Sequence, residues 1–112
     1  KDYLNRQVTA LAVLADGSSE ISNDYPAWQF LPNSELQQLM VSTFEEMFGK
    51  KPEVSAVHAG LECGLFLGKL PDLDCVSVGP DLFDVHSVNE RLSIASTERT
   101  WKYLLRILEQ SK

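Results

Sequence analysis

The sequence predicts an α/β fold with a short parallel β-α-β core and flanking helices. Two apolar segments, 53–58 and 73–78, are separated by a short helical stretch at 60–70. Helical periodicity precedes this unit at 34–48 and follows it at 96–110. A strand-helix-strand order with a short link favours parallel strands joined by a right-handed crossover. The 112 residues suffice for one compact domain.

A strand, a turn and an irregular connection are expected before the first helix. Residues 7–15, "QVTALAVLA", predict a strand because they are rich in β-branched and small apolar side chains. Residues 16–19, "DGSS", predict a turn. The segment 19–33 carries Pro26 and Pro32, which indicate an irregular extended connection. This connection is the best candidate for a boundary between two structural units.

Two longer helices flank the predicted β-α-β unit. The first is capped by Asn33 or Ser34 and ends at Gly49. Its apolar side chains recur every three or four residues, which is typical of a helix face packed in a core. They are Leu36, Leu39, Met40, Thr43, Phe44, Met47 and Phe48. The last helix is expected from Ser96 to Gln110. Its predicted buried stripe comprises Thr97, Trp101, Leu104, Leu105 and Leu108.

Both predicted core strands end in a loop that contains a histidine, His58 in one and His86 in the other. Ligands of open α/β sheets bind at the carboxyl ends of the strands. The second loop, 79–94, has no consistent period, and loops of this length in compact domains are often functional. These two loops are therefore the places where chemistry is expected.

The first loop reads "HAGLECG". Gly60 lets the backbone approach a ligand closely, and the N–H groups of Leu61, Glu62 and Cys63 favour an anion at a helix start. A carboxylate-binding loop is one interpretation. The other is a tight strand-to-helix turn with a packed, hydrogen-bonded His58. Glu62 suits a ligand or a general base, and equally a partner of the helix dipole.

The second loop contains "DVHSVNERL". Asp84 and His86 are two residues apart, so on an extended segment they point the same way, and the carboxylate can orient the imidazole. The alternative is a solvated acidic loop with a half-exposed histidine. One histidine with nearby carboxylates is a weak metal signal, because a catalytic zinc normally takes three protein ligands.

Composition excludes several classes of function. The net charge is −6 and the basic residues are scattered, which disfavours nucleic acid and anionic membranes. No apolar run is long enough to span a bilayer. Cys63 and Cys75 form no CxxC motif and are too few for a disulfide scaffold, so we expect reduced, buried cytosolic thiols. The chain starts at Lys1 without a signal peptide, and we expect it to be a piece of a longer protein.

Several stretches together resemble a known family. "HAGLECGLF", "LDCVSVGPDLFDVHSVNERLSI" and "TERTWKYLLRILE" are similar to the carboxyl-terminal end of the aminoacyl-histidine dipeptidases. These are cytosolic nonspecific dipeptidases, or peptidase D, of the M20 metallopeptidase class. "SNDYPAWQFLPNSELQQL" and "FGKKPEV" resemble the stretch just upstream in that family. The resemblance covers most of the chain, from roughly residue 20 to the end.

That family has an α/β catalytic domain with a two-metal zinc site and an inserted lid domain. The resemblance implies that residues 1–28 are the end of the lid and the return linker, with a remaining lid strand. Residues 29–112 would be the carboxyl-terminal segment of the catalytic domain. His86 matches the last metal ligand of the family. Asp84 would orient the His86 imidazole without contacting the metal. The residues that match the family's substrate-binding loop are His58, Ala59, Gly60, Leu61 and Glu62.

The chain also departs from the family pattern. The other metal ligands and the general-base glutamate belong to the amino-terminal part of such enzymes, and no His-x-Asp motif follows His58 or His86 here. Hydrolysis needs the complete metal pair to activate water. The resemblance thus implies a cytoplasmic parent zinc dipeptidase that cleaves dipeptides such as Xaa-His. The 112-residue piece is expected to contain no catalytic residue of its own and to be inactive.

Two other interpretations stay open from the sequence. The chain is alternatively a non-catalytic α/β binding or assembly module, because its apolar helix faces can dock on a partner. Uncovered faces of this kind also predict a homodimer or other self-association. The weakest interpretation is a small thiol enzyme that uses Cys63 near a helix start, although no base partner for it is evident.

Overall fold

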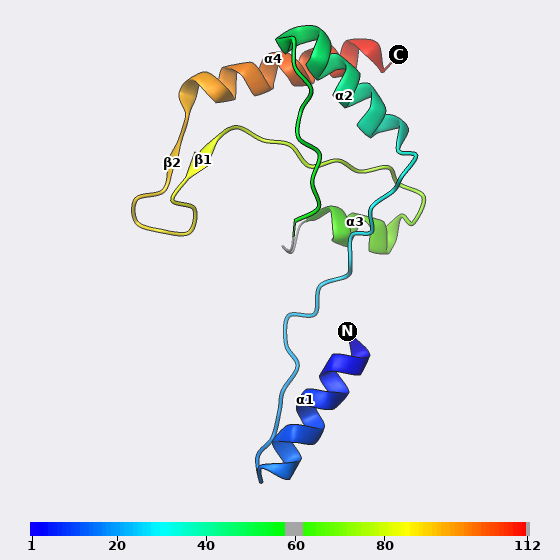
Figure 1. Cartoon of the computed structure of the whole chain (residues 1–112), viewed down its shortest axis with the longest axis vertical. Helices are drawn as coiled ribbons and strands as arrows, with labels where there is room; N and C mark the ends of the chain where they lie inside the picture. The colour runs from blue at the N-terminus through cyan, green and yellow to red at the C-terminus, as the bar shows by residue number, and fades with distance from the viewer. Residues whose placement is uncertain (58–61, 112) are drawn as a thin grey trace.

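The computed structural model describes residues 1–57 and 62–111. In chain order the elements are α1 (Asp2–Leu14), α2 (Glu35–Phe48), α3 (Glu62–Lys69), β1 (Leu82–Phe83), β2 (Arg91–Leu92) and α4 (Ile94–Gln110) (Figure 1). The two short strands pair antiparallel, with Leu82 opposite Leu92. The part of the chain that the structure describes is therefore helical, with one small hairpin.

The core lies where α2 packs against α4. Met40, Tyr103 and Ile107 are its buried hydrophobic residues. The Tyr103 hydroxyl donates a hydrogen bond to the Met40 carbonyl oxygen at 2.6 Å, and burial raises the pKa of this phenol above its ordinary value. The Phe44 ring meets the Tyr103 ring edge-on, at 5.5 Å between centroids. This contact joins two segments that lie about sixty residues apart in the chain.

Helix α2 confirms its predicted cap, its end and its apolar face. The Ser34 hydroxyl accepts a hydrogen bond from the Gln37 N–H, and Gly49 ends the helix in a left-handed conformation at φ 67°. Such a φ favours glycine because a Cβ would crowd the following carbonyl. The predicted stripe faces the core: Met40 and Thr43 are buried, and the others pack against it as Leu36, Leu39, Phe44, Met47 and Phe48.

A carboxylate from a distant segment completes the α2 cap. Asp74 accepts hydrogen bonds from the Ser34 hydroxyl at 2.7 Å and from the Leu36 N–H at 3.0 Å. Unpaired N–H groups and the helix dipole favour a negative charge at this end. The sequence predicts Ser34 as a cap because the signal is local. It contains no signal for Asp74, which lies 40 residues further along the chain.

The predicted N-terminal strand at 7–15 is wrong. These residues belong to α1, apart from Ala15, which ends it. A short apolar run cannot be assigned to strand or helix by period alone, and Leu4, Val8 and Leu11 recur at helical spacing. The expected turn follows: Asp16 takes φ 56°, and the Gly17 N–H donates to the Ala12 carbonyl.

Helix α1 projects from the rest of the molecule. An extended connection joins it to α2, as predicted for 19–33 (Figure 1). No residue of α1 is buried. The radius of gyration is 19.1 Å, against roughly 13 Å for a compact chain of this length. The described residues therefore do not close into the single compact domain that the length suggested.

The predicted parallel core strands are not formed in the part of the chain that the structure describes. Residues 51–57 and 73–80 are irregular and form no strand, and His58 lies outside the described residues. A strand requires backbone N–H and C=O groups to pair with a neighbouring segment. Val76 packs against the helical core instead. Between the two segments α3 forms as predicted, from Glu62 to Lys69.

The predicted loop 79–94 contains the β1–β2 hairpin, which the sequence did not indicate because each strand has only two residues. The last helix also starts earlier than Ser96. Ser93 caps it by accepting a hydrogen bond from the Ser96 N–H at 3.2 Å. This cap places the hairpin directly at the start of α4.

The predicted buried stripe of α4 is wrong as well. Trp101 is 61% exposed and Leu108 is 66% exposed, whereas Ser96, Tyr103 and Ile107 are the buried residues. At about 100° per residue, the two sets lie on different sides of the helix. Helix α4 carries apolar side chains on both sides, and α2 covers only one of them.

Candidate functional site

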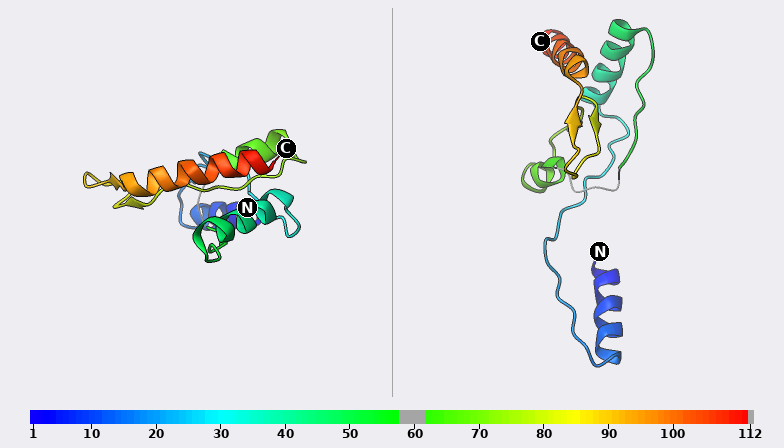
Figure 2. Two further views of the ribbon diagram at one scale, coloured as in Figure 1. Left: turned by 90° about the horizontal axis from the view of Figure 1, so that it is seen from above. Right: turned by 90° about the vertical axis from the view of Figure 1, so that its left-hand side faces the viewer.

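The β1–β2 hairpin is fastened to the first turn of α4. The Asp81 N–H donates to the Ser96 hydroxyl at 2.9 Å, and the Ser93 N–H donates to the Asp81 carbonyl at 3.0 Å. The Asp81 carboxylate pairs with Arg99 at 3.3 Å. Figure 2 shows the hairpin extending from this end of α4. The helix therefore sets the position of the loop that carries His86.

The loop between β1 and β2 holds two residues in the left-handed region, Asp84 at φ 51° and His86 at φ 63°. Neither is a glycine, so both conformations are strained and need support from their surroundings. The Ser87 N–H and hydroxyl donate to the Asp84 carbonyl at 3.2 and 2.7 Å. The Glu90 N–H donates to the Ser87 carbonyl at 3.2 Å. A closed set of local hydrogen bonds thus maintains the loop.

The Asp84 carboxylate points across the hairpin. It forms an ion pair with Arg91, whose guanidinium also lies 5.2 Å from the centroid of the Phe83 ring. Within the described residues, no hydrogen bond links Asp84 to the His86 imidazole. The expectation that Asp84 orients the imidazole directly stays a prediction. What the structure shows is a contribution of Asp84 to the loop itself.

Only one of the predicted substrate-binding residues can be placed. Glu62 opens α3 and is exposed, and His58, Ala59, Gly60 and Leu61 lie outside the described residues. No hydrogen bond or ion pair joins α3 to the hairpin among the residues described. The placement of the loop 58–62 relative to His86 therefore stays a prediction, since Glu62 is its one described residue.

Helix α3 instead packs against the connection that leads to α2. Gly64 is buried, and a Cβ there would lie 2.8 Å from the Pro26 carbonyl oxygen and 3.7 Å from the Trp28 Cβ. This close approach requires glycine at position 64. The sequence alone does not distinguish this packing role from the conformational role expected of Gly60 four residues earlier.

The described residues do not fit a complete catalytic metal centre. Within them, no three His, Cys, Asp or Glu side chains gather closely enough to hold an ion. His86 offers one exposed imidazole, whereas a catalytic zinc normally takes three protein ligands. Cys63 and Cys75 are free thiols, but half-buried rather than buried as expected. Burial, followed by the neighbouring Cys63, raises the pKa of the Cys75 thiol, which disfavours a reactive thiolate there.

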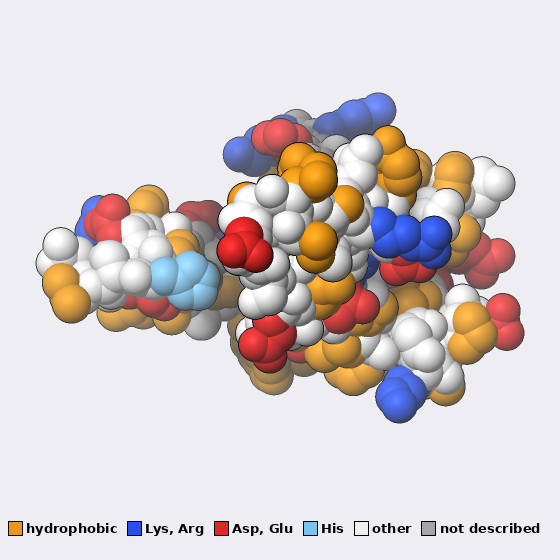
Figure 3. Space-filling view, turned by 90° about the horizontal axis from the view of Figure 1, so that it is seen from below, with side chains coloured by type: hydrophobic (Ala, Val, Ile, Leu, Met, Phe, Trp, Pro, Cys, Tyr) orange, Lys and Arg blue, Asp and Glu red, His pale blue; other side chains and the backbone are white. Residues whose placement is uncertain are grey.

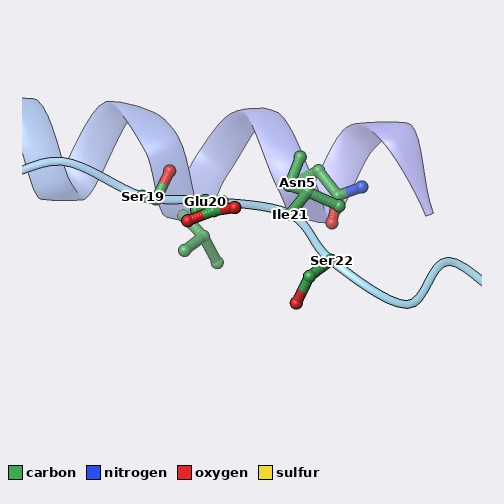
Figure 4. A pocket seen from close by; sticks show the side chains of 6 residues that line it. Asn5, Ser19, Glu20, Ile21 and Ser22 are labelled. Carbon is green, nitrogen blue, oxygen red and sulfur yellow. The ribbon is translucent and has the colours of Figure 1, made fainter.

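Two shallow hollows are open among the described residues, and His86 lines neither of them. One lies between α1 and the segment after it and is lined by Asn5, Val8, Ser19, Glu20, Ile21 and Ser22 (Figure 4). The other, at the start of α4, is lined mostly by apolar side chains, namely Leu92, Ile94, Thr97, Glu98 and Trp101. Among the predicted site residues that the structure describes, Glu62, Asp84 and His86, none lines either hollow. On the face drawn in Figure 3, hydrophobic side chains are interspersed with charged ones. None of the described helices is long and apolar enough to cross a membrane.

Comparison with known proteins identifies relatives of the whole chain. The family described as peptidase family M20/M25/M40 matches residues 16–110. The chain is 37% identical to the cytosol non-specific dipeptidase of Escherichia coli strain K12 over 110 residues. It also resembles the crystal structure of aminoacylhistidine dipeptidase from Vibrio alginolyticus, with 33% identity and a TM-score of 0.77.

These matches cover almost all of the chain but a small part of each relative. They span 98% of the chain and 23% of the Escherichia coli protein. For the Vibrio alginolyticus structure, the shares are 97% and 22%. The chain is thus under a quarter of the length of these relatives, and the resemblance to dipeptidases expected from the sequence is confirmed. Because the family match extends over most of its residues, the chain belongs to the peptidase family M20/M25/M40.

Proposed function

We propose that this chain is the carboxyl-terminal segment of the catalytic domain of a cytoplasmic, zinc-dependent dipeptidase. The parent enzyme would hydrolyse dipeptides such as Xaa-His, and the segment alone would be inactive. The observation that carries the proposal is the match to two proteins named as dipeptidases, of which the chain covers 22% and 23%. In this proposal residues 1–28 end the lid domain and residues 29–112 complete the catalytic domain.

His86 is proposed as the single metal ligand that this segment supplies. Its position is supported by the hairpin, which is fastened to α4 and holds the residue exposed at a strained φ of 63°. Strained backbone that the surroundings maintain is a common property of functional sites. A bound metal would polarise the scissile carbonyl and activate water. The part of His86 is to present a neutral imidazole nitrogen at a defined place.

The loop 58–62 is proposed to bind the carboxylate of the dipeptide. Glu62 marks the place where this loop enters α3. The early N–H groups of a helix have no partner within the helix and attract anions. In the complete domain, substrate carboxylate and metal would then be held by two loops of the same segment.

The exposed side of α4 supports the assignment to a larger domain. Its solvent-exposed apolar residues are Ile94, Trp101, Leu104, Leu105 and Leu108. Contiguous apolar surface of this kind marks a place where another part of a protein packs. The remaining part of a catalytic domain, present in relatives more than four times as long, is the proposed cover.

A chimeric enzyme tests the proposal. Residues 16–110 replace the matching segment of the Escherichia coli dipeptidase, and zinc content and hydrolysis of an Xaa-His dipeptide are measured. We expect an active chimera that loses metal and activity with His86→Ala. Lys102→Ala, on an exposed side chain of α4, serves as the control and keeps both. An active chimera in which His86→Ala changes neither quantity would contradict the proposal.

The exposed side of α4 also favours a second candidate function, a non-catalytic module that assembles through this face. Sedimentation of the 112-residue chain over a range of concentrations tests it. Self-association that Trp101→Glu abolishes would support assembly through α4, because a charge on this face opposes apolar packing. A monomer at every concentration would remove self-assembly as the function of this face.

A further inference from the structure

The loop that carries His86 also contains the carboxylate of Glu90, which has no role in the proposed function so far. The Glu90 Oε2 atom accepts a hydrogen bond from the His86 N–H at 2.9 Å. We propose that Glu90 is a positioning residue that holds the His86 backbone left-handed and thereby fixes the direction of the imidazole. The purpose of that direction, metal binding, rests on the proposed function, but the backbone restraint itself does not.

The conformation of His86 needs an external restraint. At φ 63° the Cβ of an L-residue crowds its own backbone, so the chain tends to return to negative φ. His86 is exposed, and no packed core surrounds it. The restraint must therefore come from hydrogen bonds. A bond from an N–H group to an ionised carboxylate is among the stronger ones available to an exposed loop.

Glu90 is well placed to supply this restraint. It directly precedes β2, and its own N–H donates to the Ser87 carbonyl at 3.2 Å. The neighbouring cation, Arg91, pairs with Asp84 and not with Glu90. Within the described part of the chain, the hydrogen bond recorded for the Glu90 carboxylate is the one from His86. The carboxylate therefore acts as a fixed acceptor four residues after the group that it holds.

The direction of the imidazole depends on this bond. A change of φ at His86 rotates the Cα–Cβ bond relative to the plane of the hairpin, and the ring moves with it. The hairpin itself is held independently, through Asp81, Ser93 and Ser96 at the start of α4. Loss of the Glu90 bond should consequently redirect one side chain and leave the hairpin in place.

Amide hydrogen exchange of the complete 112-residue chain, read by NMR, tests the proposal. We expect the His86 amide to be protected, and Glu90→Ala to raise its exchange rate about tenfold, the scale of one charged hydrogen bond. Glu90→Gln keeps an acceptor oxygen and should restore the protection. The His86 Cα and Cβ chemical shifts should change with Glu90→Ala and return with Glu90→Gln. Glu98→Ala, which removes an exposed carboxylate paired with Lys102 at 2.6 Å, is the matched control.

Two results would overturn the positioning role. One is unchanged exchange and unchanged His86 shifts with Glu90→Ala. The other is loss of protection at His86 together with the Ser93 amide, because that amide reports the attachment of the hairpin to α4. The outcome is separable from the proposed function, because the exchange experiment is carried out without added metal. A chimera indifferent to His86→Ala would refute metal binding and leave the Glu90 restraint intact.

Discussion

Helices α1 and α2 have nearly equal lengths, 13 and 14 residues, and each carries several apolar side chains, yet only α2 forms part of a core. No residue of α1 is buried, and Leu11 is 65% exposed. In α2, Met40 and Thr43 are buried against α4. The difference is the presence of a partner helix. Helix formation is local, but burial requires a second surface, and the stability of this chain should be concentrated in the α2–α4 pair.

Truncation of the shared aromatic residue is the strongest way to break this pair. Tyr103→Ala removes a buried ring and the hydrogen bond to Met40, and should lower the free energy of unfolding by about 3 kcal/mol. Tyr103→Phe keeps the ring and should cost about 1 kcal/mol. Urea unfolding followed by circular dichroism measures both. Equal effects of the two substitutions would show that packing of the ring contributes little.

Removal of the distant cap tests whether α2 depends on the rest of the fold at its start. Asp74→Ala takes away the acceptor of the Ser34 hydroxyl and the Leu36 N–H. We expect a loss of about 1–2 kcal/mol in the free energy of unfolding. Asp72→Ala, an exposed carboxylate two residues earlier, is the control and should have little effect. An equal loss in the control would indicate an effect of the net charge of the chain and not of helix capping.

Acid should weaken the α2–α4 pair through Glu46. Hydrogen bonds from Arg106, and then from Gln110, hold the pKa of this carboxyl below its ordinary value of 4.5. A lowered folded-state pKa stabilises the fold at pH values above the unfolded-state pKa, and that contribution is lost as the pH falls through the folded-state pKa. Urea unfolding is measured at pH values from 7 to roughly 3. The free energy of unfolding should fall less steeply with pH in Glu46→Gln than in the original chain. Both side chains are exposed, so the difference should be small.

Substitutions in α1 should have the smallest effect of all. Leu11→Ala removes a side chain that is already 65% exposed, and the change in the free energy of unfolding should stay within about 0.5 kcal/mol. The same urea series measures it. A loss comparable to that of Tyr103→Ala would mean that α1 packs in solution, and the contrast between the two helices would fail.

Local patterns predicted the helices best. The cap at Ser34, the end at Gly49 and the apolar stripe of α2 are all encoded within one helix, and all three are confirmed. For α4 the length was nearly right but the buried face was wrong, because apolar residues occupy two sides and only a partner selects between them. The lack of a pairing neighbour within the described residues likewise explains why 51–57 and 73–80 do not become strands.

The candidate site divides in the same way. The sequence by itself determined family membership, and it indicated His86 as a predicted metal ligand, since both depend on residue identity along one stretch. Only the tertiary structure decided that Asp74 caps α2, that Asp84 pairs with Arg91, and that Glu90 reaches back to the His86 amide. These contacts arise where the folded backbone brings separate groups within hydrogen-bonding distance. Sequence spacing alone does not specify that distance, because a loop can close in many ways.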